Sequence, residues 1–522
     1  MPLLLRLVLA AVAGAAVAFA FEPYAVALLL PLGVAGLSLL VRGASARVGL
    51  VVGTVFGFAF MLVLLPWLQV IGVDAWIGLS LLQGAFYGLV GFGGALVQRM
   101  RWWPVWTALL WVAAEALRSS VPFGGFPWGR LSFATADTPA AALFAYVGAA
   151  GTTFVVALVG TALAWAVSEA RRTPVLGTAA VALPLLLAFG GAVFTPWAPG
   201  PGEEPSGVVA VAAVQGDVPG EGMDAFAERR VVLDNHVAAT HELADSIAAG
   251  ETRRPDLVVW PENSTDIDPF SDPTVYADIQ GAVDAVGVPV LVGAMVGGER
   301  PQDVYNQGIV WEPGTGPAQS YSKTHPVPFG EYIPFRDQLA GLFTRLDQIP
   351  RDMVAGSEPG LLTMGGTTVG DVICFEVAYD DLLRDVVGGG ADLVVVQTNN
   401  ATYMGTGQIE QQFAISRLRA IESNRYVVVA ATNGVSGVIG PDGAVVERAP
   451  VRSRSVMVRE LPVHGSTTPA MRWGGTVEML LTLGAAVSLS FAIGLNYRRR
   501  RTTAEAVGEG PRETVTTGKG GA

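Results

Sequence analysis

Cysteine and lysine are scarce in this sequence. Its 522 residues include one cysteine, Cys374, and two lysines, Lys323 and Lys519. A single cysteine excludes an intrachain disulfide, so stability must come from a packed core. Because almost every other cation is arginine, the one lysine kept outside the polar tail indicates a need for a compact ammonium group. A lone thiol together with a lone folded amine favours covalent catalysis.

Charged residues are also few, and they are concentrated in one region. They make up 15% of the chain, whereas 51% is hydrophobic, and the mean hydropathy is +0.45. This composition predicts a multi-span α-helical membrane domain that carries one soluble domain. The net charge of −12 lies mostly in the soluble region, which argues against nucleic acid as a partner. We also expect no metal site and no cofactor.

Long apolar segments fill most of the first 200 residues and recur near the C-terminus. Each approaches the roughly 20 residues that a helix needs to cross a bilayer. The expected spans are 3–21, 24–41, 48–66, 75–97, 102–117, 140–167, 174–194 and 476–497. The first segment, with Arg6 near its start, also fits a cleavable signal peptide. Because six further spans follow at once, we favour a retained span.

Arginine alternates between the loops that join these spans. It occurs at Arg42 and Arg47, at Arg99 and Arg101, at Arg171 and Arg172, and at Arg498 to Arg501. The loops at 21–24 and 67–74 have no basic residue, and the loop at 119–139 has only Arg130. By the positive-inside rule, both termini are then cytoplasmic. The predicted parts are a membrane domain at 1–197, an extracytoplasmic domain at 198–472, a transmembrane helix at 473–497, and a basic, disordered cytoplasmic tail at 498–522.

Short runs rich in valine replace the long apolar segments in the soluble region. The predicted strands are 208–215, 256–262, 288–296, 305–313, 368–376, 392–399, 426–432 and 434–440. Helices are expected at 224–249, 273–286, 378–388 and 408–424. Valine-rich strands typically form sheets that are buried on both faces, here covered by the helices. The pattern predicts an α/β sandwich.

Polar residues gather at the ends of three predicted strands, where α/β folds commonly place their chemistry. Glu262 ends one strand, Cys374 nearly ends another, and Lys323 follows a turn, with Glu331 eight residues further on. Each has a structural alternative: a helix N-terminal acid for Glu262, a surface charge for Lys323, a turn residue for Glu331, and inert core packing for the cysteine. Their combination with a unique thiol and a unique folded amine favours a catalytic site.

Three motifs carry a family resemblance. WPE at 260–262, YSKTHPVPFGEY at 321–332 and ICFE at 373–376 resemble the Glu-Lys-Cys triad of the nitrilase, or carbon–nitrogen hydrolase, superfamily. PFGEYIP, VQGDVP at 214–219, FPWG at 126–129 and the order of spans resemble the apolipoprotein N-acyltransferase family. The resemblance implies a nitrilase-like αββα sandwich whose catalytic residues are Glu262, Lys323 and Cys374. It implies supporting roles for Glu331, Glu376 and the backbone N–H of Phe375.

Two departures from the family pattern accompany this resemblance. The stretch TNNATYMG at 398–405 stands where many relatives have NDAWFG, which leaves the role of the loop at 400–405 open. Phe375 stands where relatives often have tyrosine, so a hydroxyl role cannot be transferred to it.

The resemblance implies a two-step reaction in a bacterial plasma membrane. Cys374 accepts an acyl chain from a membrane phospholipid donor and forms a thioester. The α-amine of a diacylglyceryl-cysteine at the N-terminus of an apolipoprotein then accepts that chain as an amide. Glu262 would serve as the base, and Lys323 with the Phe375 N–H would stabilise the oxyanion. An amine outcompetes water only in a dry chamber, which explains eight spans better than simple anchoring does.

Apolar residues recur at helical spacing directly after PFGEYIP. They are Phe335, Leu339, Leu342, Phe343, Leu346 and Ile349. We predict either core packing or a short amphipathic lid that dips into the outer leaflet of the lipid bilayer. Glu115 and Arg118, three residues apart at the end of a span, predict an interfacial ion pair, with a lipid-headgroup contact as the alternative.

Two other functions are compatible with parts of the sequence. A membrane-tethered amidase or nitrilase would use the same three residues to hydrolyse a small C–N bond, but a single span would serve it. A catalytically silent assembly protein would present the same domain, but the intact Glu262, Lys323 and Cys374 argue against it.

Overall fold

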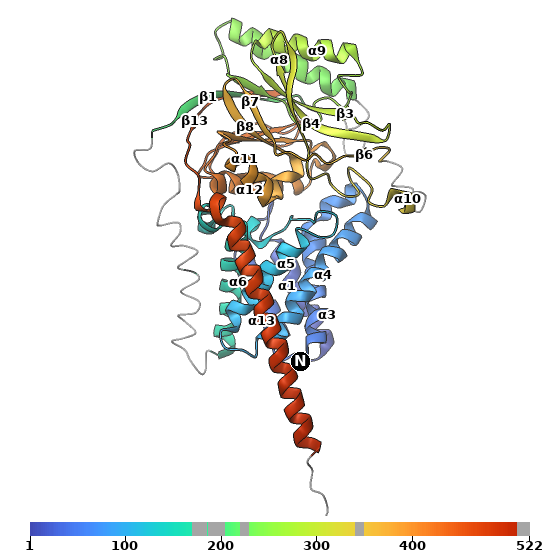
Figure 1. Cartoon of the computed structure of the whole chain (residues 1–522), viewed down its shortest axis with the longest axis vertical. Helices are drawn as coiled ribbons and strands as arrows, with labels where there is room; N and C mark the ends of the chain where they lie inside the picture. Colours follow the sequence, from blue (N-terminus) through green and yellow to red (C-terminus); the bar gives the residue numbers. More distant parts are fainter. Residues whose placement is uncertain (170–184, 186–203, 220–228, 340–348, 509–522) are drawn as a thin grey trace, which may run out of the picture.

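The structure, a computed structural model, describes residues 1–169, 204–219, 229–339 and 349–508, and the single residue 185 (Figure 1). It consists of a helical bundle with an α/β sandwich stacked on one end. The predicted span at 174–194 lies outside the described residues, except for residue 185. Of the predicted disordered tail at 498–522, residues 498–508 are instead helical, and residues 509–522 lie outside the described residues.

The bundle is built from helices at the two ends of the chain. Its members are α1 (Leu3–Ala18), α2 (Leu29–Val41), α3 (Ala46–Leu64), α4 (Val73–Val97), α5 (Trp103–Arg118), α6 (Phe144–Glu169) and α13 (Pro469–Gly508). Short 3₁₀ turns join some of them: η1 (Pro66–Val70), η2 (Leu131–Thr135) and η3 (Pro139–Leu143). Glycine allows α3 and α4 to approach closely: a Cβ added to Gly53 would lie 2.3 Å from the carbonyl oxygen of Tyr87.

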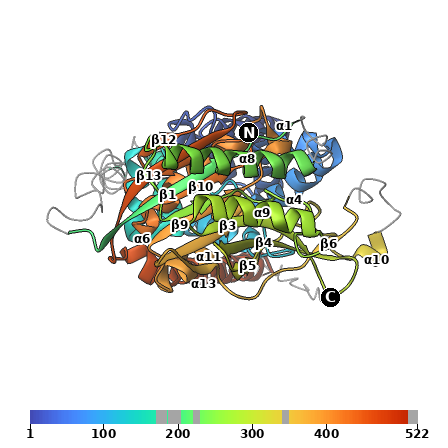
Figure 2. The ribbon, with the colours of Figure 1, turned by 90° about the horizontal axis from the view of Figure 1, so that it is seen from above.

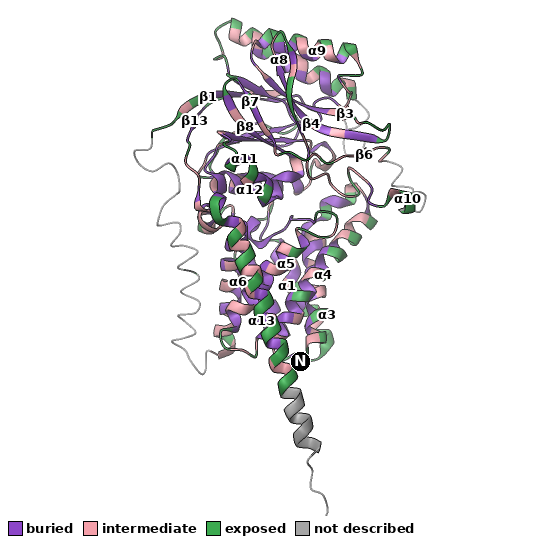
Figure 3. Cartoon of the chain, viewed as in Figure 1, coloured by how far each residue is buried: buried purple, intermediate pink, exposed green. Residues whose placement is uncertain are grey.

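Four described helical segments are long and apolar enough to cross a membrane. They are Ala46–Leu64, Val73–Val97, Pro139–Glu169 and Pro469–Arg498, and two shorter apolar helices cover Leu3–Ala18 and Leu29–Val41. The second helix begins later than the predicted span at 24–41, because residues 19–28 form turns around Pro23. The last helix is exposed along much of its length (Figure 3).

The sandwich contains two facing sheets. The first has the strand order β13 (Ser455–Val463), β1 (Gly207–Gln215), β2 (Leu257–Val259), β3 (Val290–Gly297), β4 (Asp303–Glu312) and β5 (Gly316–Ser322), with β6 (Asp352–Met353) beside β4. The second has the order β12 (Val445–Arg448), β11 (Gly437–Ile439), β10 (Val427–Ala431), β9 (Leu393–Thr398), β8 (Thr367–Ile373) and β7 (Leu361–Met364). Parallel pairs, β1 with β2, β2 with β3, β8 with β9 and β9 with β10, occupy the centre of each sheet.

Helices cover both outer faces of this pair of sheets. The helices α8 (Arg229–Ala248) and α9 (Pro273–Val286) lie side by side over the first sheet, at the end farthest from the bundle (Figures 1 and 2). The helices α11 (Asp380–Gly388) and α12 (Gln408–Ser423) lie between the second sheet and the bundle. The layers therefore follow the order helix, sheet, sheet, helix, as predicted for a nitrilase-like αββα sandwich.

The sandwich and the bundle share one apolar core. A single cluster of buried side chains includes Phe56 and Trp111 from the bundle, Leu418 from α12, and Val394 from the second sheet. A separate cluster fills the space between the two sheets. The outer face of the second sheet is therefore shielded from water by α11, α12 and the bundle.

The loops at 19–28, 65–72 and 119–139 all meet the sandwich. The side chain of Gln411 on α12 donates to the carbonyl oxygen of Glu22 (3.0 Å) and accepts from the indole N–H of Trp67 (3.3 Å). The phenol of Tyr379 donates to the carbonyl oxygen of Gly125 (3.2 Å). These are the three loops with few or no basic residues, so they share one end of the bundle.

Strand prediction was correct for the valine-rich runs and incomplete elsewhere. All eight predicted strands are present, mostly shorter by one to three residues at an end. The described residues contain five further strands: β5, β6, β7, β12 and β13. β5 reads GPAQSYS and β12 reads VVER, so neither has a long apolar run. β13 is interrupted by Arg459 and Glu460 and is held by its antiparallel register with β1.

Candidate active site

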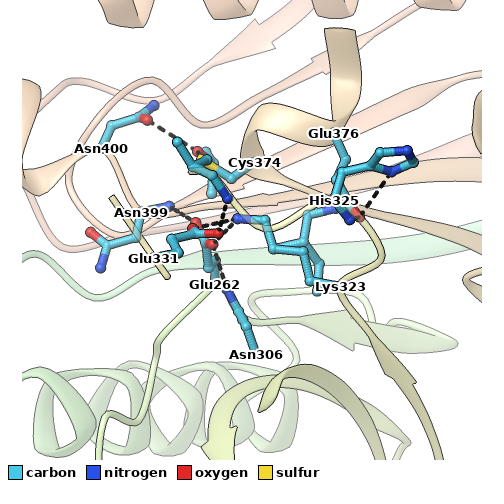
Figure 4. Close-up of polar contacts among 12 residues, drawn as sticks. Glu262, Asn306, Lys323, His325, Glu331, Cys374, Glu376, Asn399 and Asn400 are labelled. Atoms are coloured by element: carbon cyan, nitrogen blue, oxygen red, sulfur yellow. Dashed lines mark hydrogen bonds and ion pairs between the residues drawn. The ribbon is translucent and has the colours of Figure 1, made fainter. Parts of the chain in front are cut away.

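The three residues of the predicted triad come from three different strand ends and point toward one centre (Figure 4). Glu262 follows β2 after Trp260 and Pro261, and Lys323 follows β5 directly. Cys374 follows β8 and opens the 3₁₀ turn η6 (Cys374–Ala378). β2 and β5 belong to one sheet and β8 to the other, so the site lies where the two sheets meet.

Lys323 is the charged centre of this site. Its Nζ lies 3.0 Å from Oε1 of Glu262 and 2.7 Å from Oε1 of Glu331, and its side chain is 1% exposed. Burial alone would lower the pKa of the ammonium, but Glu262 and Glu331 outweigh burial and raise that pKa well above its ordinary value. Lys323 is therefore a fixed positive charge at neutral pH.

Glu262 is held by donors that the sequence did not single out. Its Oε1 accepts a hydrogen bond from Nδ2 of Asn306 (2.7 Å), and its Oε2 accepts one from the backbone N–H of Asn399 (2.8 Å). Asn306 lies on β4, and Asn399 follows the end of β9. The sequence offered one indication that Asn399 belongs to the site. It directly follows a buried strand, and strand ends gather functional groups in α/β folds.

The backbone contact from Asn399 to Glu262 gives one role to the 398–405 loop. Asn399 reaches Glu262 through its backbone, so this contact does not depend on the side chain at that position. The Asn399 side chain instead braces the loop: its Oδ1 accepts from Ala401 N (3.2 Å) and from Thr432 Oγ1 (3.1 Å).

Cys374 has an unusual backbone and a protonated thiol. Its φ is +55°, in the left-handed region that residues with a side chain seldom occupy. Oγ1 of Thr398 donates to its sulfur (3.3 Å). Burial, followed by the nearby Glu262 carboxylate, raises the pKa of Cys374 to about 12, although Lys323 acts in the opposite direction. A nucleophile at this position needs a base to accept its proton.

Glu376 joins the segment that carries Lys323 to the turn that carries Cys374. Its carboxylate accepts from the Tyr321 hydroxyl (2.9 Å), from the backbone N–H groups of Thr324 (2.7 Å) and His325 (2.9 Å), and from Ile373 N (2.8 Å). Burial opposes ionisation, yet His325, Lys323 and the backbone donors outweigh it and lower the pKa of Glu376. The resulting carboxylate fixes the spacing between the amine and the thiol.

Aromatic rings from the bundle cover the turn after Cys374. Phe375 stacks on Phe126, with 5.4 Å between ring centroids, and on Trp128, with 5.8 Å. Trp128 in turn meets Trp67, which packs edge-on against Tyr403 at 5.2 Å. The motif FPWG therefore contributes one wall of the site, and Phe375 has a packing role that needs no hydroxyl.

Comparison with known proteins matches both halves of this architecture. Residues 13–162 match the family model for the apolipoprotein N-acyltransferase N-terminal domain, and residues 210–468 match the model for carbon-nitrogen hydrolase. The chain is 37% identical over 463 residues to an apolipoprotein N-acyltransferase of Mycolicibacterium smegmatis, a match that covers 85% of this chain and 78% of that relative. The chain belongs to the apolipoprotein N-acyltransferase family.

More distant members of the apolipoprotein N-acyltransferase family match over nearly the whole chain. One from Shewanella oneidensis is 26% identical and covers 93% of this chain and 95% of its own length. One from Methylococcus capsulatus is 28% identical and covers 96% and 97%. Among solved structures, an amidase variant from Nesterenkonia sp. AN1 is 18% identical, with a TM-score of 0.37, over 50% of this chain and 93% of that one.

Family membership makes this chain an acyltransferase enzyme of the membrane and does not favour the alternatives. A membrane-tethered amidase would account for the carbon-nitrogen hydrolase match but not for the match of residues 13–162 to an N-acyltransferase domain. An assembly protein without activity would account for neither the buried Lys323 between two carboxylates nor the thiol beside it.

The predicted lid lies largely outside the described residues of this N-acyltransferase. Leu342, Phe343 and Leu346 are not described, and the side chain of Leu339 is not described either. The described part is the short helix α10 (Arg336–Leu339), preceded by Phe335, which is 66% exposed. The Phe335 ring lies 5.9 Å from that of Phe123 in the 119–139 loop.

The predicted ion pair between Glu115 and Arg118 is wrong. Both side chains are buried, and each has other partners. Oε2 of Glu115 lies 3.8 Å from Nε of Arg130, whereas Arg118 donates to the carbonyl oxygens of Phe126 (2.9 Å) and Trp128 (2.7 Å). The 119–139 loop folds back onto both residues, so a contact with lipid headgroups is wrong as well. Spacing on the helix could not reveal these partners, which arrive from a loop.

Proposed function

We propose that this enzyme transfers an acyl chain from a membrane phospholipid, through a thioester on Cys374, to the N-terminal α-amine of a diacylated apolipoprotein. The observation that carries the proposal is the buried Lys323 held between Glu262 and Glu331 beside the only thiol of the chain. The names of the relatives support the acceptor, and the apolar core shared with the bundle supports a lipid donor.

In the first half-reaction, Glu262 takes the proton of the Cys374 thiol as the sulfur attacks the ester carbonyl of the phospholipid. The tetrahedral oxyanion forms between the Lys323 ammonium and the backbone N–H of Phe375. That N–H lies in the first residues of η6, where a helical turn offers no internal acceptor. The intermediate collapses with loss of the lysophospholipid alkoxide, which takes the proton from Glu262. A thioester on Cys374 remains.

In the second half-reaction, the neutral α-amine of the acceptor attacks the thioester carbonyl, and Glu262 takes a proton from the attacking nitrogen. Collapse of the second tetrahedral intermediate breaks the carbon–sulfur bond and forms the amide. The departing sulfur recovers its proton from Glu262, so the enzyme returns to its starting state. The high pKa of Cys374 favours this last proton transfer, because the thiol is the stable form in the site.

The thioester provides the direct test. The purified full-length chain, mixed with phospholipid vesicles and no acceptor, is expected to gain one acyl group on Cys374, identified by mass spectrometry and removed by neutral hydroxylamine. Addition of a synthetic diacylglyceryl-cysteine peptide should remove the group and yield an N-acylated peptide. Acyl label that persists in Cys374→Ala, or a thioester that only water discharges, would refute the proposal.

For location, we infer that residues 198–472 form an extracytoplasmic catalytic domain of a bacterial plasma-membrane protein, with both termini in the cytoplasm. The alternation of basic loops supports this arrangement, and so does the contact of the non-basic loops with the sandwich. Reporter fusions after Ser120 should report outside, and fusions after Arg101 should report inside. A cytoplasmic signal from Ser120 would refute it.

A further inference from the structure

A buried ion network links the helical bundle to the turn that carries Cys374. Nη1 of Arg130, from the 119–139 loop, lies 2.7 Å from Oδ2 of Asp380, and Nη2 of Arg419, on α12, lies 2.7 Å from Oδ1 of the same carboxylate. The side chains of Arg130, Arg419 and Asp380 are 3%, 1% and 8% exposed. Each oxygen of Asp380 therefore takes one guanidinium, with almost no access to water.

The Arg130 end of this network is anchored in the bundle. Nε of Arg130 lies 3.8 Å from Glu115 on α5, and Nη2 lies 3.4 Å from Glu478 on α13. Glu115 is itself fixed, because it accepts from Leu131 N (2.8 Å) and from the Thr153 hydroxyl on α6 (2.7 Å). Three bundle helices thus determine where the Arg130 guanidinium lies.

The Arg419 end of the network reaches η6, the turn that carries Cys374. Nε of Arg419 donates to the carbonyl oxygen of Val377 (2.8 Å), and Nη2 donates to that of Ala378 (2.9 Å). Those are the last two carbonyl groups of η6, which begins at Cys374. A cation at the carbonyl end of a helical turn satisfies acceptors that have no partner within the turn. Glu422 also pairs with this guanidinium.

The turn needs support from outside because of its backbone. Cys374 has a φ of +55°, a conformation that persists only where surrounding contacts enforce it. Glu376 holds the start of the turn through Ile373 N (2.8 Å), and Arg419 holds its end. Arg130 fixes the carboxylate that orients Arg419. The bundle therefore bears on the position of the sulfur through this chain of ion pairs and hydrogen bonds.

We propose that Arg130 and Arg419, acting through Asp380, are positioning residues that make the membrane bundle part of the catalytic machinery. They hold the Cys374 turn in its reactive geometry, so acyl transfer depends on the docking of the bundle as well as on the triad. The effect on turnover rests on the proposed function, whereas the effect on the Cys374 thiol does not.

A second ion pair serves as a control, because it tests whether the network only holds the bundle and the sandwich together. Nη1 of Arg417, also on α12, lies 2.7 Å from Oδ1 of Asp137 in the 119–139 loop. This pair joins the same helix to the same loop, but its side chains are more exposed, at 23% and 51%. Among the described residues, neither Arg417 nor Asp137 forms a hydrogen bond or ion pair with η6. If the network only attaches the two parts, loss of either pair should lower the melting midpoint, more for the buried pair, without changing kcat of the folded enzyme or the alkylation rate of Cys374.

The experiment measures three properties of the full-length chain in phospholipid vesicles: kcat and KM for acyl transfer, the melting midpoint, and the rate of iodoacetamide alkylation of Cys374. Because Cys374 is the only thiol, alkylation reports on its geometry without any lipid substrate. The variants are Arg130→Gln, Arg130→Lys, Asp380→Asn, the double variant Arg130→Gln/Asp380→Asn, and the control Arg417→Gln.

Arg130→Gln is expected to lower kcat by about 10-fold or more, to leave KM within about twofold, and to change the alkylation rate by a similar factor. Asp380→Asn should do the same, the double variant should add little, and Arg130→Lys should recover part of the loss. Arg417→Gln should leave kcat and alkylation unchanged. The proposal is overturned if Arg130→Gln behaves like Arg417→Gln, or if kcat falls only in proportion to the unfolded fraction.

Two features keep the test decisive. If Arg130→Gln does not fold, Asp380→Asn carries the test, and a folded Asp380→Asn with wild-type alkylation and kcat overturns the proposal. If Cys374 proves not to carry an acyl group, the proposed function fails, but the alkylation rates still show whether Arg130 sets the geometry of the thiol.

Discussion

Lys323 and Glu262 form a buried ion pair, with 3.0 Å between Nζ and Oε1. In the proposed mechanism, the same carboxylate that fixes the amine takes the proton of Cys374. Breaking a buried pair by removing one partner typically costs about 3–5 kcal/mol of stability, because the other charge is left uncompensated. Stability and catalysis are therefore coupled at this pair, and variants must be compared by melting midpoint as well as by rate.

Lys323→Arg keeps the charge but changes its shape. A guanidinium is larger and flatter than the ammonium group that now fits between Glu262 and Glu331, so it moves the charge away from the oxyanion. We expect acyl transfer to fall by on the order of 10²-fold or more. Initial rates with vesicle phospholipid, taken with melting midpoints, check this. Near-normal turnover would mean that Lys323 acts only as an electrostatic neighbour.

Asn306→Ala removes one of the two amide donors that hold Glu262. With its Oε1 less constrained, Glu262 should lie in the productive position less often, and kcat should fall by about 10-fold with little change in KM. The neighbouring Gln307→Ala is a matched control, because Gln307 donates to Ser322 Oγ (2.9 Å) instead. Equal losses in the two variants would indicate a general weakening of β4.

Asp371 is a buried carboxyl group behind the site. Among the described residues, neither of its oxygens meets a donor in good geometry, and a Cβ on Gly308 would lie 2.0 Å from its Oδ2 and 2.6 Å from Oε1 of Gln397. Burial, with Glu376 and Glu262 nearby, raises the pKa of Asp371 well above its ordinary value. The protonated form of Asp371 is therefore favoured more in the folded protein than in the unfolded chain.

Asp371→Asn should therefore stabilise the protein at neutral pH. The raised pKa opposes folding wherever the unfolded aspartate is ionised, that is, above about pH 4. We expect the variant to gain about 1–3 kcal/mol at pH 7 and to lose that advantage as the pH falls toward 4. Melting curves from pH 4 to 8 test this. The control is Asp392→Asn, which should give no gain in stability, because the Asp392 carboxylate already accepts a hydrogen bond from Thr368 N (2.9 Å). A destabilised Asp371→Asn would contradict the prediction.

That Glu262, Lys323 and Cys374 lie together could be predicted in part, because the cysteine and the lysine are rare and the runs that lead to Glu262 and Cys374 are rich in valine. Cys374 and Lys323 are conspicuous by count, and each follows a strand. The contacts that hold them were not predictable in the same way. Asn306 lies inside a strand, and its side of the sheet depends on register with β3 and β5.

Contacts between the two halves of the chain were harder still to predict. Arg130 and Asp380 are 250 residues apart, and only the docking of the bundle on α11 and α12 brings them together. Local spacing instead predicted a pair between Glu115 and Arg118, which the folded loop replaces. Helical periodicity near residue 340 predicted an amphipathic segment, and whether it is core or lid stays a prediction.

Phe335→Asp tests the lid at its described end. Phe335 is 66% exposed and contacts Phe123 edge-on, so a charge there should cost little stability. If the segment at 335–349 dips into the bilayer, the charge should weaken lipid contact by a few kcal/mol at most. The variant should then lose transfer from vesicle phospholipid yet still be acylated by a short, water-soluble activated ester. Val445→Asp, on an exposed strand, controls for added charge. Equal loss of both activities with a lowered melting midpoint would show that the segment belongs to the core instead.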